Sequence, residues 1–312
     1  MMRFVYLIRL QLVLNKQMHS VTYRGSKKKL LQKPIIRDII TQNRQRKNVH
    51  YMQEKTKEMD SALTNNNMEE YRTQKKAREK RLMAYAEEIQ KKYDVATIAH
   101  LTCVCAGKDS IRQALSDMKA AGIENILALR GDIPRDYEGE VFTDFAHASE
   151  LAELIKACGD FCVGGACYPE VHPDSADRNA DIEGLKRKVE AGCEYLTTQM
   201  FFDNNIFFNF MYRIREAGIT VPVIPGIMPI TKRAQVKNAV KLSGCNVPER
   251  FKNIVDRFGD TESAMSQAGV AYATDQIIDL IANGVNHIHI YSMNKPEIAK
   301  AIQDNLSEII KR

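Results

Sequence analysis

Hydrophobic residues recur in short continuous runs from about residue 80 onward, and each run follows a helical stretch that closes on a glycine. The instances are "KAAGIENILALRG", "KACGDFCVGGA", "EAGCEYLTTQM", "EAGITVPVIPG" and "ANGVNHIHIYS". A glycine just past a helix end can adopt the left-handed conformation in which the chain reverses. We therefore expect helix-to-strand joints at five glycines, which are Gly122, Gly159, Gly192, Gly218 and Gly284.

The hydrophobic runs are nearly continuous rather than alternating, which is typical of strands buried on both faces of a parallel sheet. Asp109 and Thr261 are expected to cap helices, and Pro296 is expected in the first turn of the last helix. "VPERFKNIVDRFG" predicts an extra helix in the longest interval, and "YAEEIQKKYDVATIAHLTCV" predicts an earlier helix and strand. The pattern predicts six βα units after residue 80.

Strict alternation of strands and helices predicts an α/β fold with a parallel sheet, either doubly wound or closed into a (β/α)8 barrel. A doubly wound sheet that binds a nucleotide usually carries G-x-G-x-x-G, and the chain has no such motif. "AGKDS" lacks the upstream glycine of a phosphate-binding loop. We therefore favour the (β/α)8 TIM-type barrel.

Polar residues gather where the predicted strands end, as in "NILALRGDIP". In a barrel the chemistry lies at the C-terminal ends of the strands, so we expect these residues to face a ligand: His100, Thr102, Arg130, Asp132, Tyr168, Glu170, His172, Gln199, Asp203, Tyr291 and Asn294. Structural explanations stay open for some of them. His100 or His172 taken alone is more often a buried, hydrogen-bonded histidine, and Asp132 before a residue pair ending in proline can shape a turn. Residues 186–188 can form a solvated helix face.

Charge is spread unevenly along the 312 residues, although the net charge is only +6. Residues 1–53 hold 12 basic residues and one acid, which leaves 33 basic against 38 acidic residues in the remainder. Such a basic arm can bind nucleic acid or an anionic membrane. Its basic, acid-poor composition also weakly resembles that of an organelle transit peptide. We favour a solvated, partly disordered extension. Residues 3–14 are too short to span a bilayer.

The seven cysteines contain no C-x-x-C pair and their number is odd. Free thiols in a reducing compartment fit this pattern better than disulfides or a zinc site. We therefore expect a cytoplasmic protein without a bound metal. We also expect a small-molecule substrate and no nucleic-acid or membrane partner. A homo-oligomer stays open.

Six stretches resemble signature stretches of the bacterial, FAD-dependent methylenetetrahydrofolate reductase family: "AHLTCV", "NILALRGDIP", "ACYPEVHPDS", "LKRKVEAG", "TTQMFFD" and "VPVIPGIMPI". They follow the family's order over about residues 80–310. The resemblance implies a (β/α)8 barrel that binds FAD without a Rossmann fold. It also implies that NADH or NADPH supplies the hydride that reduces 5,10-methylenetetrahydrofolate to 5-methyltetrahydrofolate, a step of one-carbon metabolism and methionine biosynthesis.

Carried over position by position, the resemblance implies contacts with the flavin at His100, Arg130, Gly131, Asp132, Ala148, Tyr168, His172, Asp181, Arg187 and Lys188. It implies contacts with the folate at Asp132, Gln199, Gln235 and Lys295. Cations and hydroxyls suit a pyrophosphate, and a glutamine that both donates and accepts suits a pterin edge. Asp132 is the catalytic candidate, because its carboxylate can stabilise the cationic iminium that folate must become before it accepts hydride.

Three departures from the family pattern change this picture. Lys295 stands where relatives usually carry arginine, so a bidentate clamp becomes a point charge. Gly184 replaces a side chain that commonly contacts the flavin. Relatives begin with a strand like "SFEFFPP", whose glutamate acts as general acid, whereas the first glutamate here is Glu54.

The N-terminal residues 1–79 do not match the family pattern, so the predicted barrel begins at residue 80. "SVTYRGS" faintly resembles the family's second strand but lies too early, so residues 1–79 look rearranged, as after a shifted reading frame. "RFVYLIRL" and "HSVTY" would have to supply the two missing barrel strands. We expect a divergent segment over residues 1–79 and a flavin-binding barrel over residues 80–312. A catalytically impaired flavin- or folate-binding relative with a regulatory or scaffold role is the alternative to an active reductase.

Overall fold

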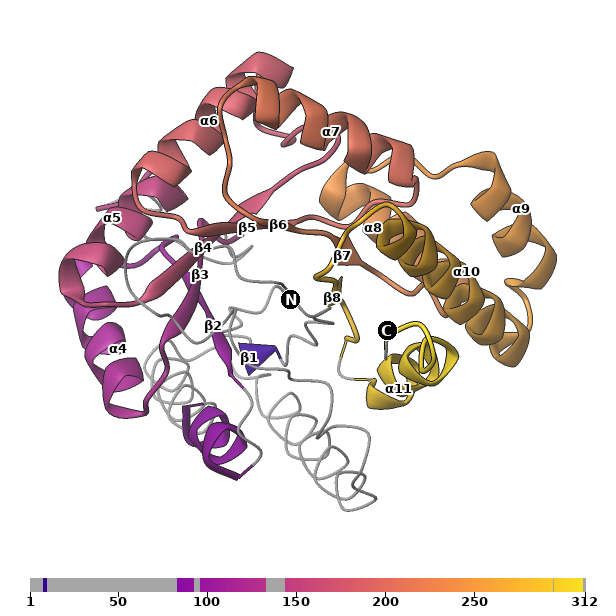
Figure 1. Ribbon diagram of the computed structural model, residues 1–312, viewed down its shortest axis with the longest axis horizontal. Helices are drawn as coiled ribbons and strands as arrows, with labels where there is room; N and C mark the ends of the chain where they lie inside the picture. The colour runs from indigo at the N-terminus through magenta and orange to yellow at the C-terminus, as the bar shows by residue number, and fades with distance from the viewer. Residues whose placement is uncertain (1–7, 10–82, 93–95, 133–143, 294, 311–312) are drawn as a thin grey trace, which may run out of the picture. The chain divides into compact units, whose positions relative to one another are not determined.

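The computed structural model describes residues 8–9, 83–92, 96–132, 144–293 and 295–310, and it divides the chain into two compact units (Figure 1). The described part of unit 1 comprises residues 8–9, 83–92, 96–132, 144–165 and 188–194. The described part of unit 2 comprises residues 166–187, 195–293 and 295–310. Each unit is described by itself. The predicted division at residue 79 stays a prediction.

Unit 1 is built on parallel strands. β2 (Ile98–Thr102) pairs in parallel with β3 (Asn125–Leu129), and β3 pairs in parallel with β4 (Cys162–Cys167), whose last two residues belong to unit 2. The register places His100 opposite Leu127. Side chains of β3 and β4 are buried almost without interruption, which explains why their sequences do not alternate.

The N-terminal strand differs from the rest in direction. β1 (Ile8–Arg9), the described part of "RFVYLIRL", pairs antiparallel with β2, whereas the strands of a (β/α)8 barrel pair in parallel. This finding agrees with the predicted irregularity of the first two strands. "HSVTY", the other candidate strand, lies outside the described residues.

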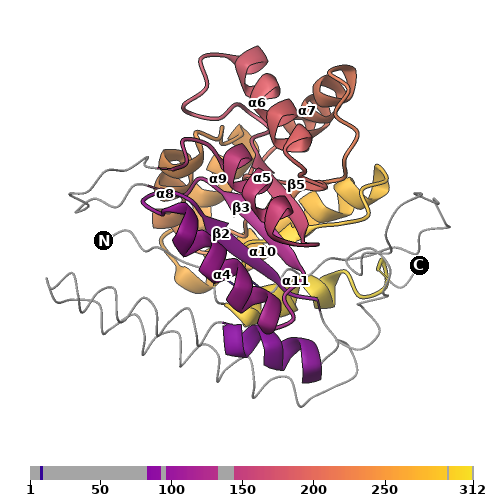
Figure 2. The ribbon, with the colours of Figure 1, turned by 90° about the vertical axis from the view of Figure 1, so that its left-hand side faces the viewer.

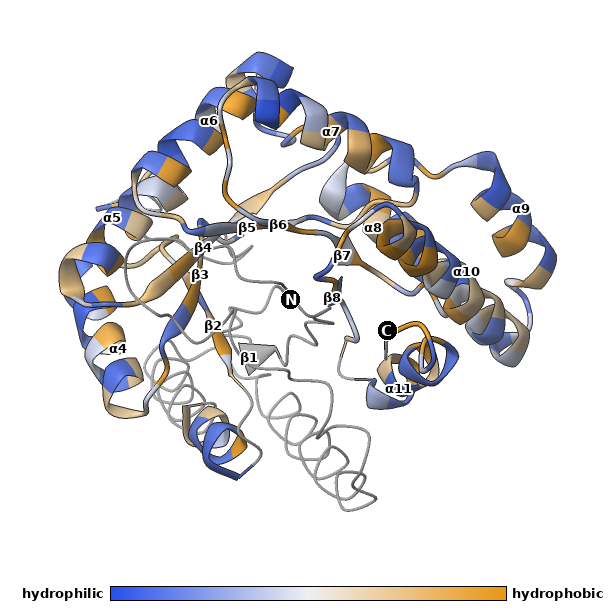
Figure 3. Cartoon of the chain, viewed as in Figure 1, coloured by the Kyte–Doolittle hydropathy of each residue, from blue (hydrophilic) through white to orange (hydrophobic). Residues whose placement is uncertain are grey.

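Helices cover one face of the unit 1 strands. Residues 83–92 are helical, as predicted, and α4 (Lys108–Ala120) and α5 (Ala148–Cys158) lie across β2 and β3 in Figure 2. Their buried sides, which include Leu115 and Leu151, form one hydrophobic core with strand residues such as Ile126. Figure 3 shows the matching alternation of hydrophobic and hydrophilic positions along both helices.

The predicted cap of α4 is wrong. Gly107 is the N-cap, and Asp109 lies in the first turn of the helix. The Lys108 N–H donates to the carboxylate of Asp144 at 2.7 Å, so a distant side chain satisfies a donor that a local cap would otherwise take. Asp109 instead pairs with Arg112 at 3.0 Å.

Unit 2 holds two strand pairs. β5 (Tyr195–Thr198) pairs in parallel with β6 (Val223–Ile224), and β7 (Gly226–Ile227) pairs in parallel with β8 (His289–Ile290). Pro225 separates β6 from β7 because proline has no N–H to donate. The predicted run "VPVIPGIMPI" is thus one strand region interrupted at its proline.

Six helices belong wholly or mostly to unit 2: α6 (Arg178–Glu190), α7 (Asn204–Glu216), α8 (Arg233–Ser243), α9 (Glu249–Phe258), α10 (Glu262–Ala282) and α11 (Pro296–Asn305). The helix expected from "VPERFKNIVDRFG" is confirmed as α9. Thr261 occupies the N-cap position of α10, although its side chain makes no capping hydrogen bond, and Pro296 begins α11, so both predicted helix starts are confirmed. None of the helices in the described ranges is long and apolar enough to cross a membrane.

Four of the five joint glycines behave as predicted. Gly122, Gly192, Gly218 and Gly284 have φ values of 71°, 103°, 82° and 85°. Gly159 does not, because its φ of 167° and ψ of −179° are those of extended backbone. The chain passes from α5 into β4 there without a left-handed residue.

The core of unit 2 is aromatic. Phe251 of α9 stacks on Phe202 with ring centroids 5.1 Å apart and meets Tyr272 of α10 at 4.4 Å. The Tyr272 hydroxyl donates to the Phe202 carbonyl at 2.7 Å, so the phenol is satisfied although it is buried. α10 packs against both α9 and α11 (Figure 1).

Gly269→Ala is expected to destabilise the protein by about 1–3 kcal/mol, because it overpacks a closed contact. A Cβ at Gly269 of α10 would lie 1.7 Å from the carbonyl oxygen of Ile230 and 2.7 Å from its carbonyl carbon. Helix and loop must therefore separate. Urea unfolding followed by circular dichroism measures the change in the free energy of unfolding.

Gly184→Ala is the matched control, because Gly184 is also helical and its Cβ would only touch Arg187 at 3.7 Å. Alanine stabilises a helix interior by about 0.8–1.0 kcal/mol relative to glycine. The two substitutions should therefore change stability in opposite directions. A Gly269→Ala protein as stable as the Gly184→Ala protein would contradict the close packing.

Candidate functional site

Polar residues directly follow four of the strands. Arg130 comes after β3, Tyr168 after β4, Gln199 after β5 and Tyr291 after β8. The prediction that polar residues stand at the C-terminal ends of buried strands is confirmed for these positions. Asn294 lies outside the described residues. The roles of all these residues toward a ligand stay predictions.

In unit 1, strand pairing continues beyond β2 and β3 and fixes the backbone of the "RGD" turn. The Cys103 N–H donates to the Leu129 carbonyl at 3.2 Å, and the Val104 N–H donates to the Arg130 carbonyl at 2.9 Å. Arg130 is therefore held beside the end of the strand that carries His100. Both side chains are partly exposed, as a ligand contact requires.

Gly131 has a structural reason to be glycine. Its φ is +87°, and a Cβ there would lie 2.9 Å from both Thr102 Cβ and Val104 Cγ1. Only glycine allows the turn to approach the end of β2 so closely. Asp132, the next residue, is exposed, as expected of a group that meets a ligand.

Cys103 joins the turn to the start of α5. Its thiol lies 3.8 Å from the Arg130 carbonyl oxygen and 3.9 Å from that of His147, the N-cap of α5. Burial raises the pKa of Cys103 to about 11, so the thiol keeps its proton at neutral pH. Ala148, the first residue of α5, is thereby fixed relative to Arg130. From the sequence, Cys103 was predicted only to be one of seven free thiols. Its position directly after "AHLT", within a family-like stretch, could have indicated that it lies near the site.

In unit 2, the loop after β4 and the first turn of α6 bring together three of the predicted flavin contacts. The rings of Tyr168 and His172 meet edge to face with centroids 4.5 Å apart. The Ser175 N–H donates to the His172 carbonyl at 2.9 Å, and the Ser175 hydroxyl donates to the Asp181 carboxylate at 3.2 Å. The loop thus holds Tyr168, His172 and Asp181 in fixed relation.

His172 has a defined tautomer. Its Nδ1 accepts a hydrogen bond from the Asp174 N–H at 3.1 Å, so the proton of the neutral imidazole is on Nε2. The alternative of an ordinary buried histidine does not hold, because the residue is only half-buried. Its Nε2–H is a donor in the loop that carries Tyr168.

The three consecutive basic residues of α6, at positions 186–188, differ from one another. Lys186 pairs with Glu183 at 2.6 Å, which is the solvated helix face that the sequence left open. Arg187 is exposed in unit 2, whereas Lys188 belongs to unit 1 and is half-buried. Charge from Lys188 lowers the pKa of Cys193, although burial is the larger effect and raises it to about 11.

Two carboxylates that follow strands, Glu170 and Asp203, accept hydrogen bonds from backbone N–H groups within unit 2. Both carboxylate oxygens of Glu170 accept the Asn246 N–H at 2.9 Å. Burial raises the pKa of Glu170, the Asn246 hydrogen bond lowers it, and the charge of Asp203 raises it. Asp203 is the N-cap of α7 and accepts the Asn205 N–H at 2.9 Å, so its position at a strand end has a structural explanation.

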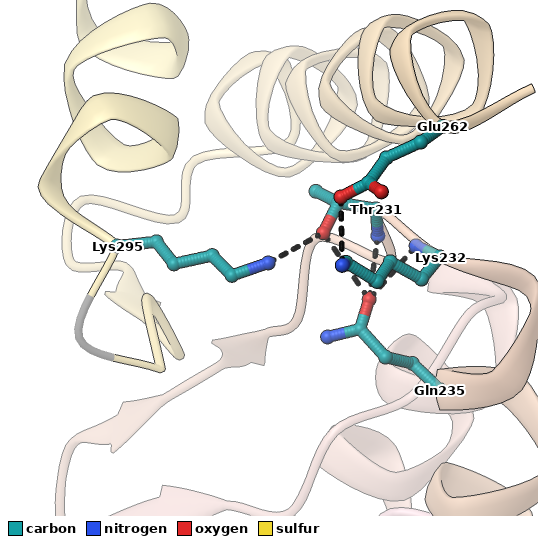
Figure 4. Close-up of polar contacts among 5 residues, drawn as sticks. All are labelled: Thr231, Lys232, Gln235, Glu262 and Lys295. Carbon is teal, nitrogen blue, oxygen red and sulfur yellow. Dashed lines mark hydrogen bonds and ion pairs between the residues drawn. The ribbon is translucent and has the colours of Figure 1, made fainter.

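The predicted folate contacts of unit 2 are partly used by the protein itself (Figure 4). The side-chain oxygen of Gln235 accepts the Thr231 N–H at 2.8 Å, the Lys232 N–H at 2.9 Å and the Thr231 hydroxyl at 3.2 Å. The side-chain oxygen of Gln199 accepts the Met200 N–H at 2.9 Å. The amide NH2 groups are therefore the ends of both glutamines that suit a ligand acceptor.

Lys295 is the N-cap of α11, and its Nζ donates to the Thr231 hydroxyl oxygen at 3.2 Å. Lys295 and Gln235 thus meet at Thr231, a buried residue that the sequence did not single out. The sequence could have indicated Thr231 as a site residue, because Thr231 and Lys232 directly follow the family-like stretch "VPVIPGIMPI".

No group of three His, Cys, Asp or Glu side chains within the described ranges is arranged to hold a metal ion. The site residues are instead single cations, hydroxyls, amides and carboxylates set at strand ends. Together with the parallel strands and intervening helices, they define an α/β protein whose polar groups follow its strands, as in barrel enzymes.

The chain belongs to the methylenetetrahydrofolate reductase family, because the family model described as "Methylenetetrahydrofolate reductase" matches residues 41–307. The match begins well before residue 80, so it reaches further toward the N-terminus than the six motifs indicated. The predicted fold class, α/β with parallel strands, is confirmed.

Individual relatives agree. The chain is 38% identical over 218 residues to "Methylenetetrahydrofolate reductase 2" of Saccharomyces cerevisiae, covering 68% of this chain and 36% of the relative. It is 36% identical over 203 residues to "5,10-methylenetetrahydrofolate reductase" of Escherichia coli, covering 65% and 67%. It is 36% identical over 240 residues to "Methylenetetrahydrofolate reductase (NADH) 1" of Zea mays, covering 72% and 40%.

The chain therefore spans little more than a third of the yeast relative and about two thirds of the bacterial one. These relatives are all named as reductases.

Proposed function

We propose that this chain reduces 5,10-methylenetetrahydrofolate to 5-methyltetrahydrofolate with hydride from NADH or NADPH, using FAD. The observation that carries the proposal is the family match over residues 41–307. The polar residue that directly follows each of four strands supports it. We also infer a cytoplasmic enzyme that acts on a small-molecule folate and serves methionine biosynthesis.

The residues present suit FAD, which when bound accepts and donates hydride. Its pyrophosphate needs cations, for which Arg130, Arg187 and Lys188 are the candidates. The ring contact of Tyr168 with His172, at 4.5 Å, offers an aromatic and a hydrogen-bonding group in one loop. Asp181, in the first turn of α6, accepts from Ser175 of that loop at 3.2 Å.

Asp132 is the residue to which we assign the folate chemistry. Opening the methylene bridge of the folate generates a cationic iminium, and a carboxylate nearby lowers the energy of that charge. Asp132 is exposed and follows Gly131, whose close approach to Thr102 and Val104 and whose neighbour Arg130, bonded to the Val104 N–H, hold the backbone there. A charge held in place before reaction loses little free energy to reorganisation.

The purified chain is expected to be yellow and to contain up to one FAD per chain, because cationic and aromatic candidates for flavin contact occur in both units. Absorbance spectra in the flavin band, before and after addition of NADH or NADPH under anaerobic conditions, measure binding and reduction. Subsequent addition of 5,10-methylenetetrahydrofolate should restore the band. Protein that stays colourless after incubation with FAD would contradict the proposed function.

A further inference from the structure

The loop that joins β4 to α6 (residues 168–177) is held from α7 by an arginine that the sequence did not single out. β4 ends at Cys167, and Pro169 just beyond it is a buried residue without an N–H. The carbonyl of a buried residue normally requires a donor. Arg213, in the last turn of α7, provides one, because its Nη2 donates to the Pro169 carbonyl at 3.2 Å. The bond lies one residue from Tyr168, a predicted flavin contact.

Two charged residues of α6 act on the same guanidinium. Burial lowers the pKa of Arg213, the charge of Arg178 lowers it further, and the charge of Asp181 raises it. An arginine nevertheless stays charged at neutral pH. Arg178 and Asp181 both belong to the first turn of α6, and α6 and α7 are neighbours in Figures 1 and 2. Arg213 therefore acts both on the loop after β4 and on the carboxylate of a second predicted flavin contact.

The place of the Arg213 side chain is not explained by its own hydrogen bonding. Its Nε is buried and has no hydrogen-bond partner among the residues that the structure describes. A buried donor without an acceptor destabilises a fold. An arginine in the last turn of a helix also interacts favourably with the helix dipole, but that interaction does not require burial. The direction of the side chain is better explained by the loop that it holds.

We propose that Arg213 is a positioning residue of the flavin site, which holds Tyr168 and Asp181 in the arrangement that binds FAD without contacting the flavin itself. The proposal rests on the proposed function and deepens it. The Ser175 hydroxyl donates to the Asp181 carboxylate at 3.2 Å and so ties the loop to α6. The bond from Arg213 ties the same loop to α7. Both attachments are needed to set Tyr168 relative to Asp181.

The loop has a further attachment next to the first. Glu170 accepts the Asn246 N–H at 2.9 Å, so Pro169 and Glu170 are held by different parts of unit 2. Loss of the Arg213 bond leaves the Glu170 bond in place. We therefore expect a loop that is displaced rather than unfolded when Arg213 is replaced.

Arg215 is the matched control, because it lies in the same last turn of α7 and also donates to backbone carbonyls. Its Nη1 donates to the carbonyls of Ile219 and Val221, the latter at 3.1 Å. The two arginines share the helix dipole and the type of hydrogen bond. They differ in the segment that they hold, since Arg215 holds the turn between α7 and β6, which carries no predicted flavin contact.

The test compares Arg213→Gln with Arg215→Gln in the full chain. Loss of a hydrogen bond from a charged group changes an equilibrium constant by about ten- to a hundredfold, and partial exposure places Arg213 at the lower end. The dissociation constant of FAD, measured by quenching of flavin fluorescence, should therefore rise about tenfold in Arg213→Gln and stay unchanged in Arg215→Gln. Arg213→Lys keeps a cationic donor, so it should show a smaller rise. It is also the variant to compare if Arg213→Gln does not fold.

A spectroscopic measurement separates positioning from a general loss of stability. Visible circular dichroism of the bound flavin, recorded at saturating FAD, reports the surroundings of the flavin rather than its occupancy. Arg213→Gln should change this spectrum, Arg213→Lys should restore it in part, and Arg215→Gln should leave it as in the unaltered chain. Weaker binding with an unaltered spectrum would overturn the positioning role.

The outcomes also separate this proposal from the proposed function. The expected loss of FAD binding in Arg213→Gln, in a chain that does not turn over 5,10-methylenetetrahydrofolate, would overturn the reductase function alone. Equal dissociation constants for Arg213→Gln and Arg215→Gln, in a chain that turns over, would overturn the role of Arg213 alone. Failure of the unaltered chain to bind FAD would overturn both.

Discussion

Asp132→Asn is expected to lower the turnover of 5,10-methylenetetrahydrofolate by about 10²–10³-fold, the usual cost of losing one electrostatic contact to a transition state. The substitution keeps the shape of the side chain and removes its charge. Asp132 is exposed and lies beyond the end of β3, so the change should not disturb the core. Flavin should still bind, because the other candidate contacts are unchanged.

Rapid-mixing absorbance in the flavin band separates the two half-reactions of Asp132→Asn. Reduction by NADH should change much less than reoxidation by the folate, because the iminium forms only in the second. Asp109→Asn is the control, since Asp109 is an exposed carboxylate of the same unit whose side chain is 98% exposed. Equal losses in both half-reactions would mean that Asp132 positions the flavin or the turn rather than stabilising charge on the folate.

Features that depend on neighbouring residues in the chain were predictable. Arg130, Tyr168 and Gln199 follow their strands directly, because a run of buried residues must end where a polar residue leaves the core. Thr261 and Pro296 mark the starts of α10 and α11 through local backbone preferences. These signals need no knowledge of the rest of the fold.

Features that depend on distant partners were not predictable. The start of α4 is decided by Asp144, which is 36 positions from the Lys108 N–H that it accepts. Glu170 is engaged by the Asn246 N–H, 76 positions away. A sequence pattern shows that such a side chain is polar at a strand end, but its partner is known only once the fold brings the two together.

The same limit applies to the candidate folate contacts. A glutamine offers both a donor and an acceptor, and nothing in the sequence excludes either for Gln235. The fold commits its oxygen to Thr231 and Lys232, so the side chain presents its donor end. The direction of β1 is a comparable case, since the apolar run that contains Ile8 is compatible with either direction of pairing.

The 312-residue chain, assayed by itself, is expected to reduce its flavin with NADH at an ordinary rate and to reoxidise it with 5,10-methylenetetrahydrofolate about 10²–10⁴-fold more slowly than an enzyme with a positioned general acid. The reason is chemical. A ring nitrogen of the folate must be protonated before the methylene bridge opens, whereas hydride transfer from NADH requires no proton donor on the nicotinamide. The glutamate that the family resemblance assigns to this step has no counterpart before Glu54 in the printed sequence.

Glu170 is the described carboxyl group best suited to replace that acid. It lies just beyond β4, and burial raises its pKa, so it keeps its proton to higher pH than an exposed glutamate. If Glu170 supplies the proton, folate reoxidation will be nearly as fast as flavin reduction, and Glu170→Gln will slow only reoxidation. Glu183→Gln is the control, because Glu183 pairs with Lys186 on the surface of α6. Fast reoxidation that survives Glu170→Gln would contradict both the predicted deficit and this replacement, and would direct the search to Glu54.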